Sequence, residues 1–411
     1  MHAKFTRFIS LLVLVCCSFV QLPAQSIFGQ LQRFKQVDVP FEYINNFIVI
    51  RVTLNDYLPM RFIFDTGAEY SILTKKEIAR VLRMPYEREY SIVGSDMKRP
   101  LKAYLVRSKK LSLGELTKPG HSLLVLEDDY FQFDEFTGVS IQGILGADFF
   151  KHFIVRIDYR RQRITLFHLD HFNVDPKTSE IPISIYKNKI YVYSPVKFHR
   201  DSTTNTKLLL DTGASLPLLL HHDTHESFRL PENAVVGNIG SGLGGSLDGY
   251  LGRINQINIG PYSFDNTITS FQATSNLPDT SFLSGRNGII GNVILSRFEV
   301  TIDYIKQKLY LKARKNYQKG FRYDRSGLVI VATGEQLNTF EVQFVIPTSP
   351  AEKAGLQEGD QIISVNGVSK NFLSLKTLNR RLQHRKNKQV KIKYRRGDQK
   401  FKTRFKLADY M

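Results

Sequence analysis

The chain has 411 residues, enough for two to four domains with sizeable hydrophobic cores. Its formal charge is +19, and residues 370–411 hold 15 lysines and arginines against two aspartates. No nucleic-acid-binding motif accompanies this charge, so we expect no nucleic-acid partner, and two cysteines are too few for a disulfide-rich scaffold.

Residues 1–26 have the pattern of a secretory signal peptide. Lys4 and Arg7 precede an apolar run over residues 8–20, and Ala24-Gln25-Ser26 places small residues where a signal peptidase cleaves. The run is shorter than a membrane span, and the alternative interpretation is a buried N-terminal helix. We expect secretion, with loss of both cysteines when the signal is removed.

The most informative pattern in the chain is a duplication. Asp65-Thr66-Gly67 and Asp211-Thr212-Gly213 lie 146 positions apart, and an apolar run precedes each of them. Other residues keep this spacing to within one position: Gly94 and Gly240, Tyr104 and Tyr250, Gly114 and Gly260, Gly143-Ile144-Leu145-Gly146 and Gly288-Ile289-Ile290-Gly291. A register held over about a hundred residues indicates two copies of one folding unit.

We place the first copy at residues 27–175 and the second at residues 176–318. Short runs rich in Val, Ile, Phe and Tyr, separated by Gly, Asn, Asp and Pro, predict that both copies consist mainly of β-strands. One short helix is predicted over residues 74–82, with Thr74 as its N-cap. A third domain is expected over residues 319–411.

The paired triplets indicate a specific chemistry. A single Asp at the end of a buried strand, followed by Gly, is commonly only a turn. Two copies that pair about a pseudo-two-fold axis bring Asp65 and Asp211 together, and two neighbouring carboxyls share one proton. The ionised carboxyl can then accept a proton from water while the neutral one donates to a carbonyl oxygen of the substrate.

These segments resemble the aspartic proteases, and the resemblance covers residues 37–315. It implies a mainly β, bilobal fold with two homologous lobes about a pseudo-two-fold axis, and it implies Asp65 and Asp211 as the catalytic dyad. It also implies roles for four supporting residues. Thr66 and Thr212 would hydrogen-bond across the two lobes, and Gly67 and Gly213 would let backbone amides approach the carboxylates.

Ala68 and Ala214 follow the triplets, as in the retroviral-type enzymes, whereas pepsin-like enzymes carry Ser or Thr there. The closer resemblance is therefore to retroviral-like, single-chain bacterial proteases, which implies a location in the bacterial periplasm or outside the cell. It implies no cofactor. His221, His222 and His225 form a local cluster, but the first copy has no equivalent, and we expect no metal there.

Two hairpins, residues 90–105 and 236–251, are predicted to cover the substrate. The residues assigned to them as flap or substrate-contacting positions are Gly94, Ser95, Gly240, Ser241 and Gly242. The glycine-rich run in the second hairpin also invites a phosphate-binding interpretation. Because it neither follows a buried strand nor opens a helix, a mobile lid is the better interpretation.

Residues 319–411 resemble a small α+β PDZ domain of the type found in bacterial envelope proteases. Ser349 and Pro350 predict the start of a helix, and Gly355 predicts its end. Asn366-Gly367 predicts a hairpin turn after an apolar strand.

Two segments near the end of this domain, residues 390–395 and 401–406, alternate basic and apolar side chains. The alternation predicts two strands with one basic face. That face is either simply solvated or attracted to an anionic envelope surface.

The leading interpretation is an aspartic endopeptidase acting on protein or peptide substrates, whose PDZ domain binds a peptide ligand or regulates the protease. The alternative is a secreted, non-catalytic scaffold that binds peptides through the PDZ domain and the cleft between the lobes. Intact Asp, Thr and Gly in both triplets argue against a silent scaffold.

Overall fold

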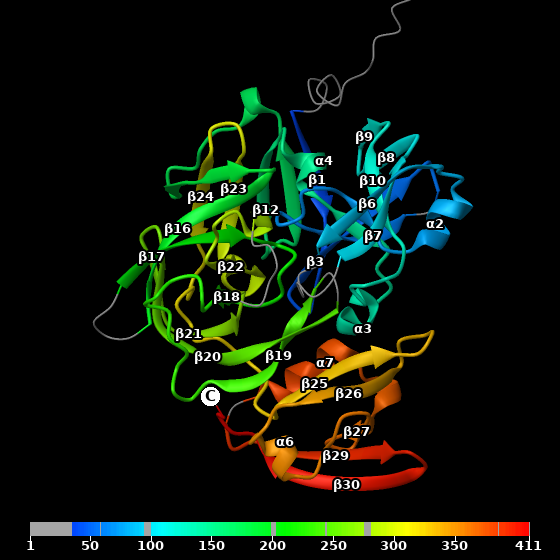
Figure 1. Ribbon diagram of the computed structural model, residues 1–411, viewed down its shortest axis with the longest axis vertical. Helices are drawn as coiled ribbons and strands as arrows, with labels where there is room; N and C mark the ends of the chain where they lie inside the picture. Colours follow the sequence, from blue (N-terminus) through cyan, green and yellow to red (C-terminus); the bar gives the residue numbers. More distant parts are fainter. Residues whose placement is uncertain are drawn as a thin grey trace, which may run out of the picture.

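The computed structural model describes residues 35–57, 59–93, 100–198, 203–242, 245–274, 281–384 and 386–410. Over these residues the chain consists mainly of β-strands, arranged as two lobes with a smaller domain below them in the view of Figure 1. The predicted signal peptide at residues 1–26 lies outside the described residues.

The elements of the first lobe are β1 (Gln36–Pro40), β2 (Glu42–Ile44), β3 (Phe47–Leu54), β4 (Met60–Phe64), β5 (Ile72–Leu73), α2 (Lys76–Val81), β6 (Tyr86–Val93), β7 (Pro100–Arg107), β8 (Lys110–Leu113), β9 (Leu116–Pro119), β10 (Ser122–Leu126), α3 (Phe133–Thr137), β11 (Gly143–Leu145), α4 (Ala147–Phe150), β12 (Ile154–Asp158), β13 (Arg163–Phe167) and η1 (Leu169–His171). Those of the second are β14 (Ser179–Pro182), β15 (Ser184–Tyr186), β16 (Lys189–Lys197), β17 (Thr203–Leu210), β18 (Leu218–His221), β19 (Val235–Gly242), β20 (Gly245–Ile259), β21 (Tyr262–Gln272), η2 (Ser281–Leu283), β22 (Gly288–Ile290), α5 (Asn292–Leu295), β23 (Phe298–Asp303) and β24 (Lys308–Ala313). The smaller domain contains β25 (Leu328–Thr333), β26 (Thr339–Val345), α6 (Pro350–Lys353), β27 (Gln361–Val365), β28 (Val368–Ser369), η3 (Lys370–Phe372), α7 (Leu375–Leu382), β29 (Gln389–Arg396) and β30 (Gln399–Lys406).

The two lobes contain sheets with the same strand order. It is β6-β7-β10-β5-β11-β4-β3 in the first lobe and β19-β20-β21-β18-β22-β17-β16 in the second. In each sheet a short strand, β11 or β22, runs parallel to the strand that leads into Asp-Thr-Gly and antiparallel to the strand after it. The duplication in the sequence is therefore a duplication of the sheet, and the mainly β, bilobal fold class is confirmed.

Glycine is required where these short strands insert. A Cβ at Gly143 would overlap the carbonyl oxygen of Ile72, and a Cβ at Gly288 would overlap the carbonyl oxygen of Leu219. The missing side chains let β11 and β22 pair with strands on both sides, which places the end of each Asp-Thr-Gly strand in the middle of its sheet.

A third sheet joins the lobes, with the order β1-β13-β12-β23-β24-β14. Its central strands, β12 and β23, pair antiparallel with Arg156 opposite Thr301, and equivalent hairpins flank them on each side. The pseudo-two-fold axis therefore passes between β12 and β23. Buried residues of this sheet, such as Ile157 and Ile302, belong to one core shared by both lobes.

The smaller domain has its own sheet, β25-β26-β27-β29-β30, and its own core around Ile362 and Leu378. Ser349 caps α6 by accepting a hydrogen bond from the amide of Glu352, with Pro350 at the first helical position, as the sequence predicts. On β29 the basic side chains are exposed and the alternate apolar ones are buried, so the predicted basic face is present.

This domain packs against both lobes. A Cβ at Gly138, which follows α3, would lie 3.1 Å from the Cβ of Leu375 in α7, and Lys376 Nζ donates to the carbonyl of Tyr43 at 2.9 Å. Figure 1 shows α3 directly above β25 and α7. Against the second lobe, a Cβ at Gly237 in β19 would lie 3.7 Å from Ile346.

The segment that connects the second lobe to the smaller domain also contributes to packing. Phe321 and Tyr323 are buried and belong to the main core of the two lobes. Arg297 lies 5.0 Å from the ring centre of Phe321, and Arg253 lies 5.1 Å from that of Tyr323. The lobes therefore need side chains beyond β24 to complete their core.

The predicted N-cap at Thr74 is wrong. Helix α2 begins at Lys76 and its N-cap is Lys75, whose side chain makes no capping bond. Thr74 follows β5 and is buried, and its amide donates to the carbonyl of Gln142 at 2.9 Å, beside β11. No helix among the described residues is long and apolar enough to cross a membrane.

Candidate active site

Asp65 and Asp211 stand at the ends of equivalent strands. The amide of Asp65, just after β4, donates to the carbonyl of Leu145 in β11 at 3.1 Å. The amide of Asp211, just after β17, donates to the carbonyl of Ile290 in β22 at 3.0 Å. Each carboxylate is therefore fixed by the strand inserted beside it.

The two threonines of the triplets connect the lobes, as the resemblance implies. The amide of Thr66 donates to Thr212 Oγ1 at 3.0 Å, and the hydroxyl of Thr66 donates to the carbonyl of Leu210 at 2.7 Å. The reciprocal bonds run from the amide of Thr212 to Thr66 Oγ1 at 3.0 Å and from the Thr212 hydroxyl to the carbonyl of Phe64 at 2.8 Å. Both threonines are fully buried, so these four bonds form a symmetric lock between the two Asp-Thr-Gly loops.

The glycines of the triplets allow the two carboxyls to approach. A Cβ at Gly67 would overlap the carboxyl of Asp211, and a Cβ at Gly213 would overlap that of Asp65. The amides of Gly67 and Gly213 each donate to the carboxylate of their own triplet at 2.7 Å. Any side chain at either position would separate the carboxyls or displace the loop.

The two carboxyls differ in their surroundings. Burial and the neighbouring charge of Asp211 hold the pKa of Asp65 well above its usual range. Burial also raises the pKa of Asp211, but a hydrogen bond from Asp65, the amide of Gly213 and the cations of Arg286 and Lys189 oppose that rise. The two carboxyls therefore share one proton, and these surroundings favour its placement on Asp65.

The loops behind the dyad are not symmetric. Asn292, at the start of α5, donates from its side-chain amide to the carbonyl of Thr212 and accepts from the hydroxyl of Tyr159 at 2.7 Å. The equivalent position in the first lobe is Ala147, and the hydroxyl of Tyr304 has no hydrogen-bond partner among the described residues. The Asp-Thr-Gly loop of the second lobe thus has one more side-chain support than that of the first.

Both carboxyls line one cavity of about 620 Å³ between the lobes. Its first-lobe wall is largely apolar and includes Ile72, Ile92, Leu105, Leu124, Phe131 and Ile144. Its second-lobe wall contains Lys189, Leu209, Leu219, Leu247, Gln272, Arg286 and Ile289. A cavity of this size, with apolar walls and a few polar groups, is typical of a binding site.

The predicted hairpins lie beside this cavity. Strands β19 and β20 form the second one, in which Gly242 pairs with Gly245, Ser241 with Ser246, and Gly240 has a φ of 144°. In the first, β6 and β7 pair and Tyr90 of β6 lines the cavity, but Gly94 and Ser95 lie outside the described residues. The covering role of both hairpins remains a prediction.

The sequence reasoning missed Lys189 and Arg286. Neither belongs to a motif: Lys189 is the first residue of β16, and Arg286 lies two residues before β22. A comparison of the two copies through the strand pairing would have found them, because both stand where the first copy has an apolar residue.

The histidines singled out in the sequence do not converge. His221 is fully buried, with both ring nitrogens unpaired among the described residues, and its burial lowers its pKa to about 3. His225 is exposed and makes its contact with Ser227. The described residues contain no group of three potential metal ligands.

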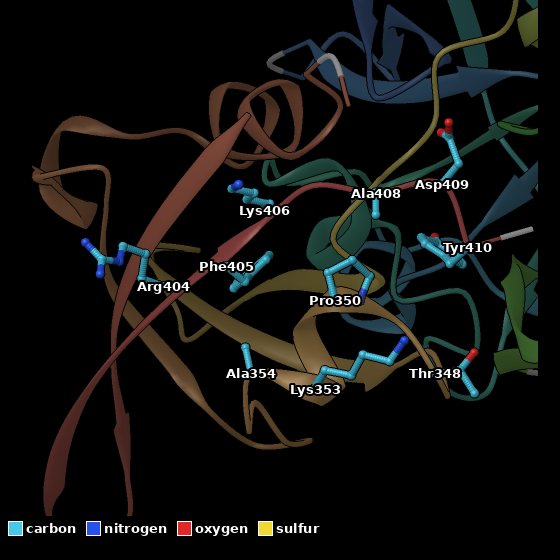
Figure 2. Close-up of a pocket in the computed structure, with 10 residues that line it drawn as sticks. All are labelled: Thr348, Pro350, Lys353, Ala354, Arg404, Phe405, Lys406, Ala408, Asp409 and Tyr410. Carbon is cyan, nitrogen blue, oxygen red and sulfur yellow. The ribbon is translucent and has the colours of Figure 1, made fainter. Parts of the chain in front are cut away.

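A second hollow, of about 480 Å³, lies on the smaller domain between α6, the end of β30 and the C-terminal segment (Figure 2). Its one acidic residue, Asp409, accepts hydrogen bonds from Tyr323 and Arg325. Among the described residues no second carboxyl lines this hollow, whereas two carboxyls meet in the cavity between the lobes, which is therefore the candidate active site.

The two-lobed β fold and the paired carboxyls are similar to those of aspartic proteases, and an additional α+β domain follows them. Residues 50–149 match the family model described as aspartyl protease, and residues 342–396 match that of the PDZ domain. A crystal structure of an aspartic proteinase from Irpex lacteus is similar at 13% identity and a TM-score of 0.46, covering 69% of this chain and 99% of that one. No curated protein matches the chain in sequence. The two family models confirm the predicted aspartyl protease domain over residues 50–149 and the predicted PDZ domain over residues 342–396.

Proposed function

We propose that the protein is an aspartic endopeptidase in which Asp65 and Asp211 activate a water molecule for peptide-bond hydrolysis. The observation that carries this proposal is the meeting of the two carboxyls in one cavity, with each loop held by the buried Thr66–Thr212 bonds. A cavity that exposes two carboxyls sharing a proton has both a base and an acid at one place.

The protonation states assign the roles. Asp211, the ionised partner, takes a proton from the water molecule while the water oxygen attacks the peptide carbonyl carbon. Asp65, the protonated partner, donates to the carbonyl oxygen as it becomes a hydroxyl. The tetrahedral intermediate then loses its amine, which takes the proton that Asp211 removed from water, while one hydroxyl proton of the intermediate passes to Asp65. Both carboxyls thereby return to their starting states, and no covalent bond to the protein forms.

A non-catalytic scaffold is the second candidate, and the geometry gives it less support. A cleft that only binds peptides does not need Gly67 and Gly213, which permit contact between the two carboxyls. Nor does it need the buried charge that this contact creates. Both features cost stability without serving peptide binding.

For the PDZ domain we propose a regulatory role through its own protease lobes, alongside recognition of a peptide ligand or partner. Its contact with α3 supports this role, because Phe133 of α3 stacks on Phe131 at 4.6 Å between ring centres and Phe131 lines the cavity. A ligand that shifts the PDZ domain relative to α3 would therefore shift a wall of the active site.

Secretion and contact with an anionic envelope surface are parts of the same proposal. The basic side chains of β29 and β30 include the exposed Lys391, Lys393, Lys402 and Arg404. Such a face binds anionic vesicles electrostatically, so binding to phosphatidylglycerol vesicles should fall as salt rises and be absent with neutral vesicles. Equal binding to both kinds of vesicle would contradict the proposal.

The function is tested by incubating the chain from residue 27 with a peptide library of unbiased sequence and reading the products by mass spectrometry. We expect internal cleavage that a pepstatin-type inhibitor reduces and that Asp65→Asn abolishes. Absence of cleavage by the folded wild-type protein between pH 4 and 8 would favour the scaffold.

A further inference from the structure

Two cations line the candidate active site without an ion-pair partner. Lys189, at the start of β16, and Arg286, just before β22, face the same cavity as Asp65 and Asp211. Neither forms an ion pair within 4.0 Å among the described residues, and the buried Nε of Arg286 makes no hydrogen bond. Burial lowers the pKa of both side chains, as expected when a charge loses water without gaining a close partner.

The first lobe serves as an internal control. Val49 pairs with Ile63 in β3–β4 and Tyr191 pairs with Leu209 in β16–β17, so Lys189 stands at the position of Phe47.

Arg286 lies two residues before Gly288 and Ile141 lies two before Gly143, so these positions are also equivalent. Likewise, β10 pairs with β5 in the first lobe as β21 pairs with β18 in the second. The register of these pairs makes Gln272 the equivalent of Leu126.

The three first-lobe residues, Phe47, Ile141 and Leu126, belong to one continuous apolar cluster. The corresponding cluster in the second lobe is reduced to three buried residues, Leu219, Ile239 and Leu247. The second lobe has therefore exchanged apolar core for charge on the wall that faces the dyad.

Such an exchange costs free energy in the unliganded protein, because buried charges without close partners are expensive. The carboxylates whose charges act on Lys189 are Glu69, Asp211 and Asp65, and Glu69 is hydrogen-bonded to Tyr70 on the first lobe. None of these described carboxylates forms an ion pair with Lys189 or Arg286 within 4.0 Å. The partner that this arrangement lacks is an anion that enters the cavity.

We infer that Lys189 and Arg286 form a subsite for a carboxylate of the substrate, with Gln272 as an additional hydrogen-bonding group. This inference rests on the proposed peptidase function and names the substrate class. The second-lobe side of the cavity binds an acidic group beside the scissile bond, and the apolar first-lobe side, around Phe131 and Ile144, binds an apolar residue.

The carboxylate can come from an Asp or Glu side chain or from the free C-terminus of a peptide. The test uses one peptide cleaved in the library, made in four forms: with Glu or with Gln next to the scissile bond, each with a free or an amidated C-terminus. We expect kcat/KM about ten- to a hundredfold higher for Glu than for Gln if a side chain is bound, since hydrogen bonds to charged groups are strong. A preference that instead follows the free C-terminus assigns the terminal carboxylate.

Variants then assign the preference to residues. Lys189→Met and Arg286→Met should each reduce the ratio of kcat/KM for the Glu peptide to kcat/KM for the Gln peptide toward one. Lys189→Glu should favour a peptide with Lys next to the scissile bond. Lys306→Met, at an exposed turn that does not line the cavity, is the matched control and should keep the wild-type ratio of the two kcat/KM values. Because a change in the dyad affects both peptides alike, the ratio isolates the subsite.

A catalysis-independent measurement separates this inference from the proposed function. The Asp65→Asn variant should bind the Glu peptide about tenfold or more tightly than the Gln peptide, and Arg286→Met in that background should remove the difference. Lack of cleavage together with this binding preference would overturn only the peptidase. Cleavage and binding with no preference for either carboxylate would overturn the subsite.

Discussion

The amide of Thr66 donates to the hydroxyl of Thr212 at 3.0 Å, and the amide of Thr212 donates to the hydroxyl of Thr66 at the same distance. This reciprocity is possible only because the two residues face each other across the pseudo-two-fold axis. The bonds hold two loops that carry neighbouring carboxyls, which repel each other whenever both are ionised.

The first prediction concerns this pair. Thr212→Val removes the hydroxyl and leaves the Thr66 amide and the Phe64 carbonyl buried and unpaired, at about 1–3 kcal/mol for each group. We expect a clear fall in the thermal unfolding midpoint and in kcat/KM. Thr212→Ser keeps the hydroxyl and should stay close to wild type in activity. If Val and Ser variants were equally stable and active, the lock would have no functional role.

The second prediction concerns the charge stored in the dyad. The folded-state pKa of Asp65 is raised, so the unfolded chain releases this proton near pH 4 while the folded protein retains it. The stabilising contribution of this group is therefore present at low pH and is lost as pH rises toward the folded pKa. Asp65→Asn has no such proton, so its unfolding midpoint should rise relative to wild type between pH 4 and 7. If the midpoint of Asp65→Asn minus that of wild type stayed constant or decreased from pH 4 to pH 7, the raised pKa of Asp65 would be contradicted.

The third prediction concerns His221, whose effect on stability changes with pH in the opposite direction. His221 is buried and neutral, with its pKa lowered to about 3, whereas in the unfolded chain it takes up a proton near pH 6.5. Stability is therefore lost as pH falls from 6.5 toward 3, by at most about 1.4 kcal/mol per pH unit for this residue. His221→Leu should reduce this acid sensitivity in urea unfolding curves measured at several pH values. The exposed His171→Gln serves as the control, and equal pH slopes in both variants would contradict the account.

The fourth prediction concerns the PDZ domain. A chain that ends after Tyr323 retains Phe321 and Tyr323 in the core of the lobes and should stay folded and cleave short peptides. A chain that ends at Lys319, close to the boundary predicted from the sequence, lacks both aromatic side chains and should unfold at a lower temperature. The PDZ domain should matter for whole-protein substrates. If the longer truncation is folded but cannot hydrolyse a short peptide, the PDZ domain is part of the catalytic architecture.

Local patterns with an internal repeat were sufficient to predict the lobes, the meeting of Asp65 and Asp211 and the threonine pairing. The 146-residue spacing already places Asp65 beside Asp211, because equivalent points of a duplicated unit meet at its axis. Helix α6 was equally predictable, since Ser349 and Pro350 carry the capping chemistry themselves.

Other features depend on contacts between distant segments. Lys189 is equivalent to Phe47 only through the strand pairing, because the hairpin that contains it is four residues longer than its first-lobe counterpart and breaks the constant spacing. The docking of α7 on Gly138 likewise has no local signature. At Thr74 the bond to Gln142 outweighed a good capping residue.

The central claim is that the two carboxyls act as one unit. The most direct measurement is the single-turnover rate on one library peptide for wild type, Asp65→Asn, Asp211→Asn and the double variant, with folding checked by thermal unfolding. We predict that each single variant loses roughly a hundredfold to ten-thousandfold and that the double variant is no worse than either. Substantial cleavage by one folded single variant, or losses that multiply in the double variant, would contradict a shared-proton dyad.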